Sequence, residues 1–226
     1  MPPGKAAYKD RALWDVPVSV LSGVHLPLAS RLRHEKTCGG QMTLNISDYF
    51  ADLQAHEYAT TWLYCDRLGY VTIGIGCRVF NADAAAALPW ATGKDDPRAA
   101  WLRVHNAFGP AKPSALYYQS FSDLRLTMDA VTAMVAQRLE TEFMPCLYRL
   151  CPGFDGFPKP ARRALVDMAW QYGDESSTRG LAGFPSMLAA CNSDPPDWAT
   201  AAIESHGECS AGRNAWRAQM FLDAAA

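Results

Sequence analysis

The chain lacks the features that mark several common classes of protein. Its 21 basic and 23 acidic residues nearly cancel, so no strong field for binding polyanions is expected, which argues against a dedicated nucleic-acid binder. No apolar run is long enough to span a bilayer, so stable membrane insertion is not expected. Residues 17–28 are partly apolar, but His25 interrupts them and no clear cleavage site follows. We therefore do not expect a signal peptide.

The cysteines lack the spacing of a metal-binding knuckle. None of the seven cysteines forms a C-x-x-C pair with another, so no zinc site is expected. An odd count leaves at least one thiol unpaired. Cys146 and Cys151 could pair near a helix end, but a reduced core accounts for the composition equally well, and both alternatives stay open.

Apolar residues make up 49% of the 226-residue chain, enough to bury the core of a soluble domain built as one or two lobes. Residues 1–46 are irregular, and we interpret them as an N-terminal extension or linker that precedes a domain over 47–226. We see no internal repeat.

Apolar spacing, caps and prolines predict a mostly helical domain with a small β part, an α+β fold. Ser47 is the expected N-cap of a first helix over 48–57, and residues 64–77 are expected to form a β-hairpin or small sheet. Further helices are predicted at 84–88, after Asp96, from Thr127 to a stop at Pro145 and Pro152, from Pro160 to Gly173, and at 184–190, 198–204 and 213–224.

The segment from His56 to Cys77 holds the pattern that carries chemistry. Glu57 ends the apolar stripe of the first expected helix, and desolvation there favours a neutral, proton-donating carboxyl. Asp66 lies in a polar stretch where water can keep it charged, and Thr72 follows. Glycosidic bond cleavage needs an acid on one face of the sugar and a carboxylate on the other. Each of these residues also has a purely structural interpretation. Glu57 could be a solvated helix end, Asp66 a turn former and Thr72 a residue that fills a strand.

The spacing of these residues resembles the signature of the phage-type lysozymes, the T-even bacteriophage endolysin family. That signature is a Glu, then Tyr-x-Asp, then Gly-x-x-Thr-x-Gly-x-Gly, and it appears here between Glu57 and Gly76. A second block, ARRALVDMAWQYG followed by LAGFPSML, resembles the central buried helix of that family and the helix after it. A weaker third block is GRNAWR, at 212–217. The resemblance covers roughly 47–77 and 126–223.

The resemblance implies a lysozyme-like fold, with the active cleft between a mostly helical lobe and a small β lobe. It implies that Glu57, Asp66 and Thr72 are catalytic, and that the substrate-binding or supporting residues are Arg213, Gln171, Tyr64 and Phe184. Arg217 is an alternative to Arg213. The chain departs from the family at Cys77, where a His is common, in an enlarged insertion over 78–125, and in a polar insertion over 174–180.

The function implied is that of a muramidase. It would hydrolyse the β-1,4 bond between N-acetylmuramic acid and N-acetylglucosamine in peptidoglycan strands, with inversion and as a monomer, using no metal or cofactor. Two alternatives are a chitinase- or chitosanase-like hydrolase of the same fold and a non-catalytic glycan-binding protein. Made in the cytoplasm, the enzyme would reach the periplasm or wall by holin-type release, as a phage endolysin, or by injection, as a secreted antibacterial effector with a secretion-machine carrier and an immunity protein.

Overall fold

The computed structural model describes residues 46–109, 111, 114–173 and 180–226. The strands are β1 (Thr60–Cys65), β2 (Val71–Gly74) and β3 (Cys77–Arg78). The α-helices are α1 (Ile46–His56), α2 (Ala82–Ala86), α3 (Pro97–Asn106), α4 (Met128–Arg138), α5 (Met144–Leu150), α6 (Lys159–Tyr172), α7 (Pro185–Cys191), α8 (Trp198–Glu204) and α9 (Ala211–Asp223). The short helices are η3 (Ala115–Phe121), η4 (Leu139–Phe143), η5 (Phe154–Gly156) and η6 (Leu181–Gly183).

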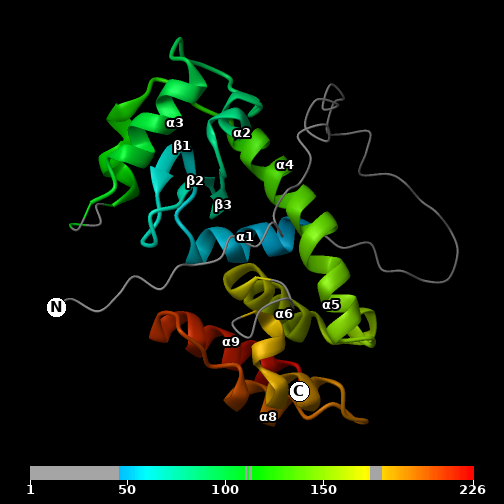
Figure 1. Ribbon diagram of the computed structural model, residues 1–226. Helices are drawn as coiled ribbons and strands as arrows, with labels where there is room; N and C mark the ends of the chain where they lie inside the picture. Colours follow the sequence, from blue (N-terminus) through cyan, green and yellow to red (C-terminus); the bar gives the residue numbers. More distant parts are fainter. Residues whose placement is uncertain (1–45, 110, 112–113, 174–179) are drawn as a thin grey trace, which may run out of the picture.

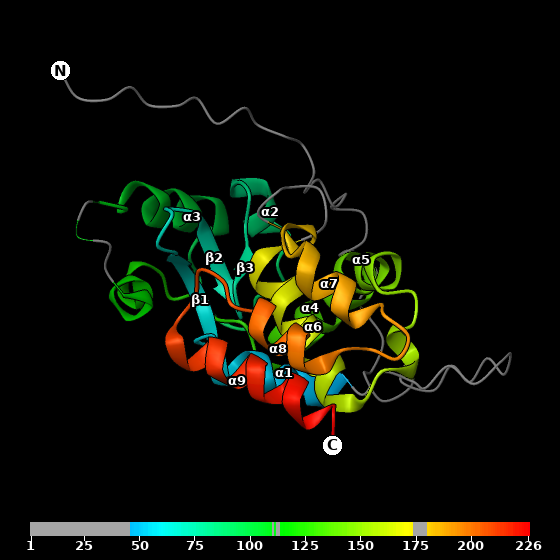
Figure 2. The same ribbon diagram turned by 90° about the horizontal axis from the view of Figure 1, so that it is seen from below.

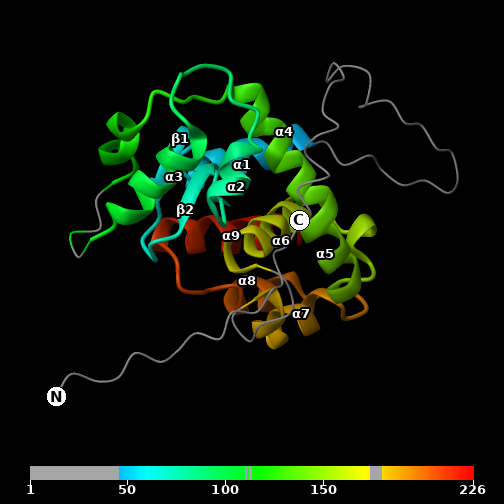
Figure 3. The same ribbon diagram turned by 45° about the horizontal axis from the view of Figure 1, so that its top comes forward.

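The predicted mixture of many helices with a small sheet is confirmed. Figure 1 shows the sheet with α2 and α3 at one end of the molecule, and α6, α8 and α9 at the other. The chain passes between the two ends through α1 and through α4 and α5, which follow one another along one side of the molecule (Figure 3). The expected extension over 1–46, apart from Ile46 at the start of α1, and most of the insertion over 174–180 lie outside the described residues.

The sheet is antiparallel, with strand order β1-β2-β3. Tyr64 pairs with Thr72, and Thr72 pairs in turn with Arg78 on the third strand. The chain reverses between β1 and β2 at Gly69, whose φ of +88° is in the left-handed region that favours glycine. A Cβ there would lie 2.9 Å from the ring of Phe108, so the turn needs glycine for space as well. The predicted hairpin is confirmed, with a third strand added.

Most of the predicted helix signals act as expected. The side chains of Asp96 and Thr127 accept hydrogen bonds from the first turns of α3 and α4, and Gly173 ends α6 with a φ of +83°. The first helix starts earlier than predicted, because Ser47 lies inside α1 rather than before it. The predicted 84–88 helix lies two residues earlier, as α2.

The prediction that Pro145 closes the helix begun at Thr127 is wrong. The chain stays helical from α4 through the π-helical turn η4 into α5, and it leaves the helix at Cys151, before Pro152. The N–H of Met144 donates to the carbonyl of Leu139, five residues back. This hydrogen bond across five residues shifts the pattern of backbone hydrogen bonds just before Pro145. The helix therefore does not require the N–H that proline lacks.

The core centres on α6, which packs against α1, α5 and α9. Leu165 and Met168 are fully buried, as predicted for a central helix. Asp167, on the same helix, is only 1% exposed. A buried carboxylate is tolerated only when it is paired, so its partners decide how the helices around α6 fit together.

Among the described residues, no disulfide joins any two of the cysteines, namely Cys65, Cys77, Cys146, Cys151, Cys191 and Cys209. The reduced alternative therefore holds for them, including the Cys146 and Cys151 pair. In the part of the chain that the structure describes, no helix combines the length and apolar character needed to cross a bilayer.

Candidate active site

Glu57 is the first residue after α1, and its N–H still donates to the carbonyl of Leu53, 2.8 Å away. Its Oε1 lies 2.6 Å from Nη1 of Arg213, in the first turn of α9. The Glu57 side chain is 30% exposed. The predicted contact between Arg213 and Glu57 is confirmed.

Arg213 is itself held in place by Asp167. Its Nη2 lies 2.8 Å from Oδ1 of Asp167, its Nε donates to the same carboxylate, and Nη1 also donates to Oε1 of Gln171. Burial opposes a charge on Arg213, but the hydrogen bonds and charges of Asp167 and Glu57 outweigh it and raise the pKa of Arg213. The guanidinium is therefore a fixed cation that presents one N–H to Glu57.

Arg217, the alternative to Arg213, does not contact Glu57. It is fully buried, with Nε 2.6 Å from Oδ2 of Asp167 and Nη1 3.1 Å from the hydroxyl of Tyr172. The alternative of an exposed helix-face charge is therefore wrong for this residue. Arg213 and Arg217 are four apart and lie on one face of α9, so Asp167 bridges both of them.

Asp167 is the site residue that the sequence analysis missed. It stands inside the apolar string ALVDMAW, and an acid that is fully buried on a helix needs cationic partners. Two arginines one helical turn apart in GRNAWR were the matching signal. Together they predict an ion network between α6 and α9, and the structure has one. Figure 2 shows the ribbons of these two helices.

Asp66 lies in the turn between β1 and β2. Its Oδ1 accepts hydrogen bonds from the backbone N–H groups of Leu68, at 2.8 Å, and Tyr70, at 2.9 Å. Neither bond uses Oδ2. Asp66 therefore acts as a turn former, as the alternative interpretation predicted. A carboxylate held through one oxygen keeps the other available, and its position is set by the turn.

Thr72 lies opposite Tyr64 in the sheet and is 3% exposed. Its hydroxyl donates to the carbonyl of Tyr70, 3.0 Å away. Burial raises the pKa of Tyr64, and the negative charges of Glu57 and Asp66 raise it further. The Tyr64 hydroxyl is therefore within electrostatic reach of both candidate catalytic carboxylates, on the side of the sheet shared with Thr72.

The last two predicted residues have different places. Gln171 is at the site, because its side-chain oxygen accepts from Arg213. Phe184 packs on Tyr172, with ring centroids 4.8 Å apart, and Tyr172 in turn accepts from Arg217. Phe184 therefore touches the buried network through Tyr172, and the contacts recorded for it do not reach Glu57.

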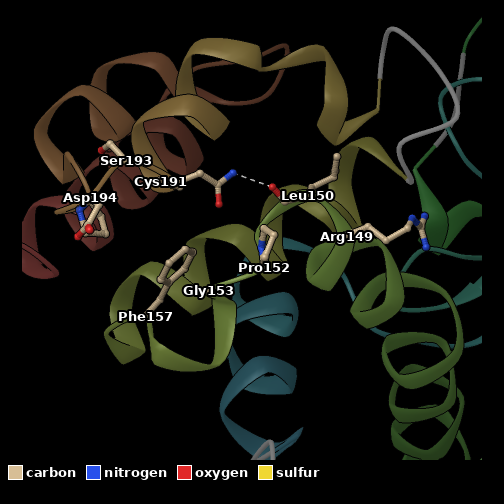
Figure 4. A pocket seen from close by; sticks show the side chains of 10 residues that line it. Arg149, Leu150, Pro152, Gly153, Phe157, Cys191, Ser193 and Asp194 are labelled. Atoms are coloured by element: carbon tan, nitrogen blue, oxygen red, sulfur yellow. Dashed lines mark hydrogen bonds between the residues drawn. The ribbon is translucent and has the colours of Figure 1, made fainter.

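Two pockets lie among helices α5, α7, α8 and α9. The larger, of about 640 Å³, lies between the C-terminal ends of α5 and α7, where Asn192 donates to the carbonyl of Leu150 at 2.7 Å (Figure 4). The smaller lies between α8 and α9. Neither is lined by the predicted catalytic residues. Within the described ranges, no group of three or more His, Cys, Asp or Glu side chains is placed to hold a metal ion.

Comparison with models of known protein families gives no match, and neither does comparison with curated proteins. The assignment of a function therefore depends on the residues quoted above and on where the structure places them.

Proposed function

We propose that the protein is a lysozyme-like muramidase that hydrolyses the β-1,4 bond between N-acetylmuramic acid and N-acetylglucosamine in peptidoglycan. The observation that carries this proposal is the ion pair between Glu57 and the buried, fixed guanidinium of Arg213. A carboxyl whose position is fixed in this way suits the acid of a reaction that needs an acid and a base on opposite faces of a sugar. The glycan strand would bind between the sheet and the end of the molecule formed by α6, α8 and α9.

Glu57 would act as the general acid. Because Arg213 donates to Oε1, the proton delivered to the leaving oxygen would be carried on Oε2. Arg213 would act as a positioning residue, since it fixes the rotamer of the acid without touching the sugar. Asp167 would hold Arg213 in turn.

Asp66 and Thr72 would hold the attacking water on the other face. The Thr72 hydroxyl already gives its proton to the carbonyl of Tyr70, so its lone pairs are left to accept from water. Oδ2 of Asp66 would accept the proton that water loses. Attack by water rather than by a carboxylate gives inversion, which requires room for the water between the two carboxyls. This chemistry needs no cofactor.

We place the reaction in the periplasm or on the cell wall, reached by holin-type release or by injection. An injected enzyme would require an immunity protein in the cell that makes it. The alternative with the same acid is hydrolysis of chitin or chitosan, because both are β-1,4 chains of amino sugars. Comparing purified sacculi with chitin as substrates separates the two.

The experiment that tests the proposal is Glu57→Gln, assayed by loss of turbidity of purified sacculi and by the appearance of reducing-end muramic acid. The glutamine oxygen can still accept from Arg213, so the fold should be kept, while loss of the acid should lower the rate at least ~100-fold. Glu204→Gln, at an exposed helix end, is the matched control and should behave as wild type. A Glu57→Gln protein with wild-type melting and near wild-type clearing would overturn the proposal.

A further inference from the structure

Two aromatic side chains that follow Glu57 closely in the sequence have no part in the chemistry described so far. Tyr58 directly follows Glu57 and is 59% exposed, and Trp62 is a partly exposed residue of β1. Their ring centroids are 6.4 Å apart, with planes inclined at 65°. The pair therefore forms an edge-to-face aromatic cluster that begins one residue after the candidate acid in the sequence, although exposure of an aromatic ring to water is unfavourable.

The Trp62 ring is fixed from the side of the insertion. Its indole N–H donates to the carbonyl of Ala115 in η3, 3.0 Å away, and the guanidinium of Arg125 lies over the ring, 5.7 Å from the centroid. Arg125 is itself held by three backbone carbonyls, those of Ser122, Leu124 and Gln119. These contacts fix the orientation of the ring, so a ligand that binds on it would not have to order it first.

We infer that Tyr58 and Trp62 form a sugar subsite on which a pyranose ring of the β-1,4-linked amino-sugar chain stacks next to the residue cleaved at Glu57. A pyranose has a face of C–H groups, which suits an aromatic ring, and a polar rim of hydroxyl and amide groups. The exposed phenol of Tyr58 can meet that rim, and because Arg125 covers one face of the Trp62 ring, a sugar would use the other face. The glycan chain is extended, so a sugar bound at Glu57 places the neighbouring sugars along the adjoining protein surface. This subsite rests on the proposed function for the identity of its ligand.

The subsite involves the region over 78–125, which distinguishes this chain from the family it resembles. The segment η3 lies against β1 and supplies the carbonyl that fixes Trp62. The insertion would therefore extend the glycan-binding surface beyond the catalytic residues. It would raise affinity for long strands more than for short ones.

The test measures binding separately from cleavage. The full chain carrying Glu57→Gln is titrated calorimetrically with peptidoglycan glycan strands freed of their peptides. Adding Tyr58→Ala should weaken binding by about 3- to 10-fold, the range expected for loss of one aromatic stacking contact. Tyr58→Phe should keep most of the affinity, because stacking uses the ring. The matched control is Tyr148→Ala, which removes an exposed tyrosine (37%) of α5 whose ring contacts Phe154, outside β1 and η3.

Each outcome decides the inference. Weaker binding in Tyr58→Ala alone, with unchanged melting, supports it, and a parallel loss in Trp62→Phe would add the second ring. Unchanged binding in Tyr58→Ala, an equal loss in Tyr148→Ala, or no binding of strands by the starting protein overturns it. If wild type binds strands through Tyr58 but never cleaves them, the muramidase proposal fails while the subsite stands.

Discussion

Arg213 and Arg217 share one carboxylate but should have different effects on activity, and this difference tests the site most sharply. Replacing Arg213 by alanine removes its bonds to Asp167, Glu57 and Gln171. Replacing Arg217 removes its bonds to Asp167 and Tyr172 and leaves the Arg213–Glu57 pair in place. Only the first change releases the candidate acid.

The size of the effect on stability follows from burial. Breaking a buried ion pair costs about 3–5 kcal/mol, and because Asp167 keeps one arginine in each variant, the lower end applies. About 3 kcal/mol corresponds to a drop in Tm of roughly 6–12 °C for a domain of this size. The two variants should therefore melt at similar, lowered temperatures, since both arginines are almost fully buried.

Activity should separate them. Well below both melting temperatures, Arg213→Ala should lose on the order of 100-fold in the rate of sacculus hydrolysis, because Glu57 is no longer positioned. Arg217→Ala should keep most of its rate. Circular dichroism melting and turbidity assays of the two variants measure both effects. Equal losses of rate, or a loss confined to Arg217→Ala, would refute the assignment.

Two further predictions concern the turn and the end of α1. Asp66→Asn should abolish hydrolysis yet keep the melting temperature, because the amide oxygen still accepts from Leu68 and Tyr70 but cannot take a proton from water; a large fall in Tm would show that the charge itself holds the turn. Burial is the main cause that lowers the pKa of His56 below its ordinary 6.5, so the unfolded chain binds the proton more readily and stability should fall as pH drops below about 6.5. His56→Gln should flatten that decline in pH-dependent melting, and an unchanged slope would assign it to other groups.

Much of the secondary structure was predictable because its causes are local. The cap at Thr127, the proline start and glycine stop of α6, and the glycine turn after Asp66 each depend on residues within one turn of the chain. The π turn before Pro145 was not predictable in this way. It arises where the helix continues through a proline, and no local pattern in the sequence distinguishes that from a helix that stops.

The sequence by itself determined the candidates for catalysis: the order Glu57, Asp66, Thr72 and an arginine near the C-terminus. The tertiary structure alone decided which arginine meets the acid. Glu57 and Arg213 are 156 positions apart, and they meet because α6 carries Asp167 between α1 and α9. Periodicity places both arginines on one face of α9, but only the packing of that face against a buried carboxylate directs Arg213 to Glu57 and Arg217 to Tyr172.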